Sequence, residues 1–159
     1  MRDLAAFAAY LPRVDYVGEV GLDYSSEGRP TQAAQVRVFE RILALPDGDR
    51  KVWTIHSRRA EEDVVRRLEQ MPRAAALHWY TGPASLIDRA CARVLTETDA
   101  PFTIARGAPT DPREVRQIVR ALASVWGVSE DEAKAQVYGN MAAIFSRARG
   151  ETTPGQGVA

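Results

Sequence analysis

The chain has 159 residues, enough for one domain with a sizeable core, and its 45% hydrophobic and 26% charged residues are typical of a globular protein. Its 21 basic and 21 acidic residues balance, so the net charge does not indicate a nucleic-acid partner, although a local basic rim would not change the sum. The single cysteine cannot form an intrachain disulfide, and the sequence has no run of about eighteen apolar residues and no N-terminal signal pattern. We therefore expect a soluble, cytoplasmic protein without membrane contact.

Strand-like and helical segments alternate up to residue 98. Residues 3–11 predict a helix that Pro12 ends. The segments that follow are a strand over 14–20, a helix over 31–45, a strand over 51–56, a helix over 59–71, a strand over 74–79, a short helix around 84–91 and a strand over 93–98. This alternation predicts a parallel sheet with right-handed crossovers.

The number of strand–helix units limits the architecture. About four units are predicted, whereas a closed eight-stranded α/β barrel typically needs about 250 residues. The predicted fold class is therefore α/β, either an open four-stranded sheet or a partial TIM-type (β/α) barrel. Periodicity alone does not choose between these two.

Two helix starts are predicted after the last strand. Asp111 before a proline, with Glu114 at the third helical position, predicts a helix over 112–126. Ser129 and Glu132 have the spacing of a capping box, which predicts another helix directly afterwards.

The last part of the chain is expected to be less regular. Gly139 and Asn140 are predicted to end one helix and to cap another. We expect a single domain over residues 1–148 and a disordered tail over 149–159, because the final ETTPGQGVA is polar and rich in small residues.

Four side chains of the kinds that bind metals stand at the ends of strand-like segments. Glu19 lies in VGEVGLDY, His56 ends VWTIH, His78 ends AAALH, and Asp99 lies in RVLTETDAPF. The carboxyl ends of parallel strands open onto the crevice where ligands bind, so residues far apart in sequence are expected to meet there. Imidazole and carboxylate groups together predict a divalent-metal site.

Each of these residues also has a structural interpretation. A single histidine at a strand end is usually a hydrogen-bonded structural residue, and Glu19 is also compatible with an exposed strand end. Glu97 alternates with Asp99 along the last strand, so the pattern does not decide which of the two points inward. Asp23 is expected to cap the turn after the first strand rather than to join Glu19. The recurrence of histidine at two strand ends favours the metal site.

Five motifs spread over residues 14–145 resemble those of the TatD family of metal-dependent DNases. In chain order they are VGEVGLDY, TIHSRRA, LHWYTG, VLTETDAPF and GNMAAIF. The resemblance implies a TIM-type barrel hydrolase that holds two divalent ions, Mg²⁺, Mn²⁺ or Zn²⁺, near the carboxyl ends of its strands. It also implies cleavage of phosphodiester bonds in DNA, in single strands or at 3′ ends. The HWYTG and TETDAPF motifs are similar to the TatD-type member of Qat anti-phage systems.

The resemblance further implies a role for each candidate residue. Glu19 matches the glutamate that bridges the two metals, His56 and His78 match the histidines of one metal site, and Asp99 matches the aspartate of the other. Glu19 and Asp99 are the implied catalytic carboxylates, with Asp99 holding or deprotonating the attacking water. Arg58 matches the arginine of the family's HSR motif, and we expect it to contact a phosphate of the substrate.

The sequence departs from the family pattern in two places. No histidine precedes His56, so the family's His-x-His pair on the first strand is absent. Only twenty residues separate His78 from Asp99, so a strand–helix unit that is usual in the family is expected to be missing there. About half of the barrel would then be absent, and one metal site would keep only Glu19 and Asp99. Exposed sheet edges are expected to favour aggregation or pairing with another chain.

Three interpretations remain open at this point. The chain is a TatD-like, metal-dependent nuclease that is truncated at the N-terminus or internally shortened, and it releases nucleotides from DNA in the presence of Mg²⁺ or Mn²⁺. Alternatively, it is a catalytically impaired remnant that acts as an accessory or partner-binding protein without hydrolysis. The third interpretation is the product of a decayed gene, with poor solubility and no partner.

Overall fold

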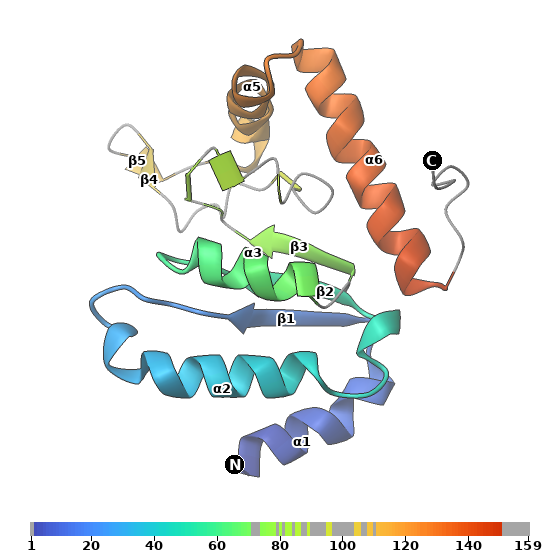
Figure 1. Cartoon of the computed structure of the whole chain (residues 1–159). Coiled ribbons are helices and arrows are strands. Elements are labelled where there is room, and N and C mark those ends of the chain that lie inside the picture. The colour runs from blue at the N-terminus through green and yellow to red at the C-terminus, as the bar shows by residue number, and fades with distance from the viewer. Residues whose placement is uncertain are drawn as a thin grey trace.

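Three parallel strands form the centre of the fold (Figure 1). The structure, a computed structural model, describes residues 2–70, 74–78, 80, 82–83, 85–86, 89, 95–96, 104–105, 108–109 and 111–150. Within this part of the chain the central sheet has the order β1 (Tyr16–Gly21), β2 (Val52–His56) and β3 (Ala74–His78), and each neighbouring pair is parallel. The α/β class is therefore confirmed, as are the first three predicted strands.

Helices connect these strands, as crossovers between parallel strands require. The first three are α1 (Arg2–Tyr10) before β1, α2 (Gln32–Leu43) between β1 and β2, and α3 (Glu61–Gln70) between β2 and β3. Figure 1 shows α2 running alongside β1, which it contacts, and α1 close to α2 at the bottom of the view. All three helices were predicted, and their bounds differ from the expected ones by at most two residues.

The sheet is most deeply buried on the face that packs into the helical core. In β2, Trp53 and Ile55 are fully buried, and they alternate with Thr54 and His56, which are only partly buried. Trp53 donates its indole N–H to the Gly48 carbonyl at 2.9 Å, so the polar atom of this core side chain is satisfied. The same cluster includes buried side chains of α2 and α3, namely Phe39, Ile42, Leu43, Val64, Val65 and Leu68.

Both predicted helix starts are present, the capping box of Ser129 and Glu132 among them, and Asp111 with Glu114 forms a second capping box. The side chain of Glu114 accepts the Asp111 backbone N–H at 3.0 Å, and the Asp111 carboxylate caps the same turn in return. The Glu132 backbone N–H donates to Ser129 Oγ at 3.2 Å, while the Glu132 carboxylate accepts the Ser129 backbone N–H at 2.9 Å. The helices that follow these boxes are α5 (Val115–Trp126) and α6 (Glu130–Ala148).

One prediction is wrong in this region, because α6 continues through Gly139 and Asn140 without a break. Asn140 is buried, and its Oδ1 accepts a hydrogen bond from Gln136 Nε2 at 2.7 Å, one turn earlier in the same helix. The side chain that would otherwise compete with the helix backbone is thus satisfied inside the helix. α6 also packs against β2 and β3, and Phe145 lies edge-on to Tyr16 of β1 with ring centroids 6.1 Å apart. Packing of this kind outweighs local helix propensity.

The connection between β3 and α5 differs from the prediction where it is described. Leu95 and Thr96 fall in the predicted strand 93–98, but neither of them is in a strand. Two very short strands that the sequence did not predict form an antiparallel pair, β4 (Ile104–Ala105) with β5 (Ala108–Pro109).

Some predictions concern residues outside the described part of the chain. Asp99 and Glu97 lie there, as do residues 151–159 of the expected tail. The aspartate half of the candidate metal site and the boundary between a 1–148 domain and a tail therefore stay predictions. In the part of the chain that the structure describes, no helix combines the length and the apolar character needed to cross a membrane.

Candidate functional site

Glu19, His56 and His78 meet at the carboxyl ends of the three parallel strands. His56 is the register partner of Gly21 on one side and of His78 on the other. The Nδ1–H of His56 donates to Oε1 of Glu19, and Nε2 of His78 lies 3.5 Å from Oε2 of the same carboxylate. The imidazole rings have centroids 6.5 Å apart and are tilted by 31°. One carboxylate therefore joins two histidines that come from different strands.

The alternation of the strands explains why both histidines face this carboxylate. Ile55 and Leu77 directly precede the two histidines and are buried in the core, so the histidines project from the opposite face of the sheet. On β1, Gly18 allows the backbone to approach β2 closely, because a Cβ at this position would lie 2.8 Å from the Cβ of Thr54. The close approach of β1 to β2 brings Glu19 within reach of His56.

The three side chains are accessible to a ligand. The exposed fractions are 16% for His78, 25% for His56 and 39% for Glu19. A carboxylate with this exposure keeps part of its hydration, so its charge does not require a permanent partner inside the protein. The cluster is thus an open site at the edge of the core.

Asp23 also lies at this site, although the sequence assigned it only to the following turn. The turn prediction is confirmed, since Asp23 Oδ1 accepts the Ser25 backbone N–H at 2.7 Å. The other oxygen, Oδ2, lies 3.8 Å from Nε2 of His56. The backbone pairing of β1 and β2 continues past the strand ends, with Leu22 N–H donating to the His56 carbonyl at 3.0 Å, and this brings Asp23 beside His56.

The electrostatic surroundings of Asp23 favour its ionised form. Burial by itself would raise the pKa of this carboxyl, but hydrogen bonds from Ser25 and the electrostatic influence of the nearby His56 and Arg58 lower the pKa below its ordinary value of 3.8.

Arg58 lies on the rim of the cluster. Its side chain is exposed. Its carbonyl accepts the Tyr24 backbone N–H at 2.9 Å, and this bond joins the loop after β2 to the loop after β1. Its charge contributes to the lowered pKa of Asp23. An exposed arginine next to a cluster of imidazoles and carboxylates is suited to contact an anionic group of a ligand.

The donor atoms suit a divalent cation, but they are bonded to one another in this structure. Two imidazoles with carboxylate oxygens are ligands typical of Zn²⁺ and Mn²⁺. Within the described residues, however, no group of three or more histidine, cysteine, aspartate and glutamate side chains is arranged to hold a metal ion. Glu19 directs one oxygen to each histidine, so the three groups do not point to a common centre. Asp99, the fourth candidate ligand, lies outside the described residues.

Two solved structures resemble this fold. YjjV, a TatD homolog from Escherichia coli K12, matches with a TM-score of 0.70 and 22% sequence identity, over 90% of this chain and 70% of that one. A TatD family hydrolase from Entamoeba histolytica matches with a TM-score of 0.57 and 15% identity, over 89% of this chain and 66% of that one. These similarities support a partial TIM-type barrel, and no curated protein matches the chain.

The model of the family described as TatD related DNase matches nearly the whole chain. The match consists of two segments, residues 1–93 and 89–146. They overlap at residues 89–93, between His78 and Asp99. Together the segments include Glu19, Arg58 and both histidines. The chain belongs to the TatD related DNase family.

Proposed function

We propose that this protein is a divalent-metal-dependent nuclease that hydrolyses phosphodiester bonds in DNA. The observation that carries the proposal is the meeting of Glu19, His56 and His78 at the ends of three adjacent parallel strands in a chain of this family. Catalytic groups of parallel α/β folds are found at this end of the strands.

Glu19, His56 and His78 are the residues that would hold a metal ion, with Asp99 as a further ligand. A bound divalent cation would polarise a phosphoryl oxygen and lower the pKa of a water molecule. Glu19 and Asp99 are the proposed catalytic carboxylates, Asp99 as the group that orients the attacking water or accepts its proton.

The hydrogen bond between Glu19 and His56 prepares His56 for this role. A carboxylate accepts only, so the proton of a neutral His56 lies on Nδ1, and Nε2 carries the free lone pair. Nε2 of His56 lies 3.8 Å from Oδ2 of Asp23, which is also an acceptor. A cation near these two atoms would interact favourably with both of them, which supports metal binding and makes Asp23 an additional candidate ligand.

Arg58 is the residue that would position the substrate. Arg58 is exposed, lies two residues after His56, and its charge acts on the pKa of Asp23; a phosphate of the DNA backbone could form a bidentate interaction with its guanidinium. Its positive charge would also partly offset the electrostatic repulsion between a phosphate and the carboxylates of the site.

A nuclease assay with matched variants tests this proposal. The purified chain is incubated with a single-stranded oligonucleotide labelled at its 5′ end, with Mg²⁺, Mn²⁺ or EDTA, and Mn²⁺ binding is measured separately by calorimetry. We expect shortening of the oligonucleotide with metal, none with EDTA, and at least a hundredfold loss of rate in Glu19→Gln and His78→Ala.

Glu27→Gln is the control for these variants. Glu27 is an exposed glutamate in the loop after β1, and no hydrogen bond or ion pair of its side chain occurs among the described residues. The variant removes the same charge as Glu19→Gln but should leave metal binding and cleavage unchanged. Cleavage that persists in EDTA or in Glu19→Gln would contradict the proposed role of the cluster.

A further inference from the structure

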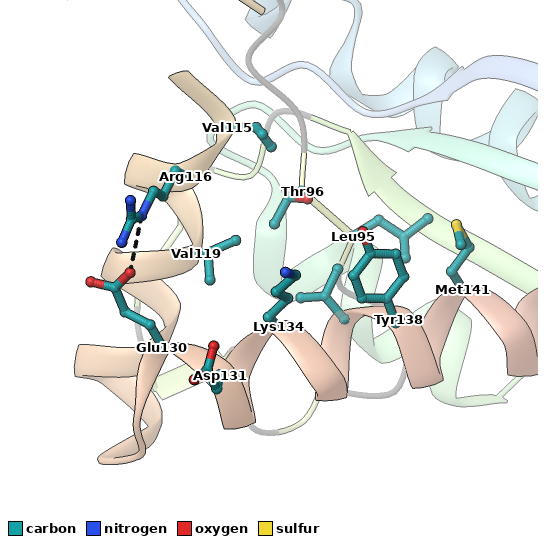
Figure 2. Close-up of a pocket in the computed structure, with 11 residues that line it drawn as sticks. Leu95, Thr96, Val115, Arg116, Val119, Glu130, Asp131, Lys134, Tyr138 and Met141 are labelled. Carbon is teal, nitrogen blue, oxygen red and sulfur yellow. Dashed lines mark hydrogen bonds and ion pairs between the residues drawn. The ribbon is translucent and has the colours of Figure 1, made fainter. Parts of the chain in front are cut away.

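A cavity of about 530 Å³ lies between α5 and α6. Figure 2 shows its walls, which are formed by one face of each helix and by the segment Leu95–Thr96. None of Glu19, Asp23, His56 and His78 lines it. Its volume is within the range of about 300–1,000 Å³ that is typical of sites for small molecules.

Most of the wall is apolar. Val119 of α5 lies on one side, and Leu95, Tyr138 and Met141 lie on the other (Figure 2). Tyr138 is 58% exposed and Met141 is 39% exposed, so neither is covered by the core of this chain. An apolar ligand in the cavity would remove part of this surface from water, which favours binding.

Lys134 is the charged group available to a ligand. Its side chain projects from α6 toward the cavity (Figure 2), and no carboxylate of the described residues pairs with it. The charge of Arg116, in contrast, is already paired, because its Nε donates to Oε2 of Glu130 at 3.2 Å. Arg120 donates to the other oxygen of Glu130 at 2.8 Å, and the two arginines lower the pKa of this carboxyl.

The charges around the cavity limit the ligand to a single negative charge. The three cations Arg116, Arg120 and Lys134 and the two anions Glu130 and Asp131 give a net charge of +1. The two carboxylates at the rim would repel a dianionic phosphate, whereas one carboxylate can pair with Lys134. We propose that this cavity binds an amphipathic monocarboxylic acid, with the carboxylate on Lys134 and the apolar body against Val119, Tyr138 and Met141.

Octanoate and its uncharged analogue octanol are the probes for this site. Calorimetric titration of the full chain below the critical micelle concentration should give saturable binding of octanoate that is tighter than that of octanol. Lys134→Met should weaken octanoate by about fivefold, the effect of a partly exposed ion pair, and should leave octanol unchanged. Arg37→Met, which removes an exposed cation of α2 instead, is the control and should change neither affinity.

Cavity-filling variants test the apolar half of the proposal. Val119→Trp should abolish binding of both probes, and Met141→Trp, at a more exposed position, should weaken both by at least tenfold. Circular dichroism verifies that each variant is folded. If Val119→Trp does not fold, the test rests on Met141→Trp. Absence of saturable octanoate binding, equal affinity in Lys134→Met, or unchanged binding in a folded cavity-filling variant would overturn the proposal.

Discussion

His56 and His78 are direct register partners at the last positions of β2 and β3, and their imidazole centroids lie 6.5 Å apart. Glu19 reaches both rings from β1. The site therefore depends on the register of three strands, because a shift of one residue would turn a histidine to the buried face of the sheet. Any change that separates β1 from β2 should disturb the stability of the sheet and the geometry of the site together.

Substitution of Gly21 tests this dependence. A Cβ at Gly21 would lie 2.0 Å from the carbonyl oxygen of His56, which is backbone and cannot move aside without shifting β2. We expect Gly21→Ala to lower the free energy of unfolding by about 1–3 kcal/mol or more, as overpacking does. The variant should also lose Mn²⁺ binding if the cluster binds the metal. Urea denaturation and calorimetry measure the two effects, and an unchanged urea midpoint would show that β1 and β2 are not in close contact at Gly21.

The central strands and their helices were predictable because their patterns are local. Short apolar runs ended by turn residues marked β1 to β3, and apolar side chains at helical spacing marked α2 and α3. The meeting of Glu19, His56 and His78 followed from one topological rule, since the carboxyl ends of parallel strands share an edge of the sheet.

The remaining features depend on tertiary contacts that no local pattern contains. Asn140 is compatible with the interior of α6 because Gln136 and the core surround it. Asp23 lies beside His56 because backbone pairing continues beyond the ends of β1 and β2, and turn chemistry alone did not indicate this. The strands β4 and β5 have two residues each, which is too short for any periodicity.

The continuity of α6 leads to a prediction at Gly139. No atom lies within 4 Å of a Cβ placed there, and the residue is in the middle of a helix. Gly139→Ala should therefore raise the free energy of unfolding by about 0.5–1 kcal/mol.

Gly127 provides the matched control in the same pair of helices. It ends α5 with a φ of 65°, a left-handed conformation that alanine adopts only with strain, and it also has open space around its Cβ position. Gly127→Ala should lower the free energy of unfolding by about 1 kcal/mol. If urea denaturation showed Gly139→Ala to be destabilised in the same way, the helix would be interrupted at Gly139.

The contact between Tyr24 and Asp63 should make stability depend on pH. The Tyr24 hydroxyl donates to Asp63 Oδ2 at 2.8 Å. Burial acts to raise the pKa of Asp63, but the bond from Tyr24 and the charges of Arg67 and Arg66 lower it below 3.8. Because the pKa is lowered in the folded protein, this contribution is present above the unfolded pKa and is lost as the pH falls through the folded value.

Tyr24→Phe removes this hydrogen bond. We expect it to lower the free energy of unfolding by about 1 kcal/mol at pH 7, and the difference from the unchanged protein should shrink as the pH falls through the lowered pKa of Asp63 and this carboxyl becomes protonated. Tyr10→Phe is the control, since Tyr10 is 63% exposed and its hydroxyl has no hydrogen-bond partner among the described residues. An equal loss of unfolding free energy in Tyr24→Phe at pH 7 and at acidic pH would mean that the hydroxyl does not act through the charge of Asp63.

Arg58 and its neighbour Arg59 allow a matched test of DNA binding, since both are exposed and carry the same charge. The charge of Arg58 lowers the pKa of Asp23 at the site, whereas Arg59 has a left-handed backbone with φ of 56°, and its N–H bonds the Glu61 carboxylate. If Arg58 contacts one phosphate of a single strand, Arg58→Gln should reduce the steepness of log K against log salt by about 0.7. Arg59→Gln should leave this slope unchanged. Fluorescence anisotropy of a labelled oligonucleotide over a range of NaCl concentrations gives both slopes, and equal slopes for the two variants would exclude a specific phosphate contact of Arg58.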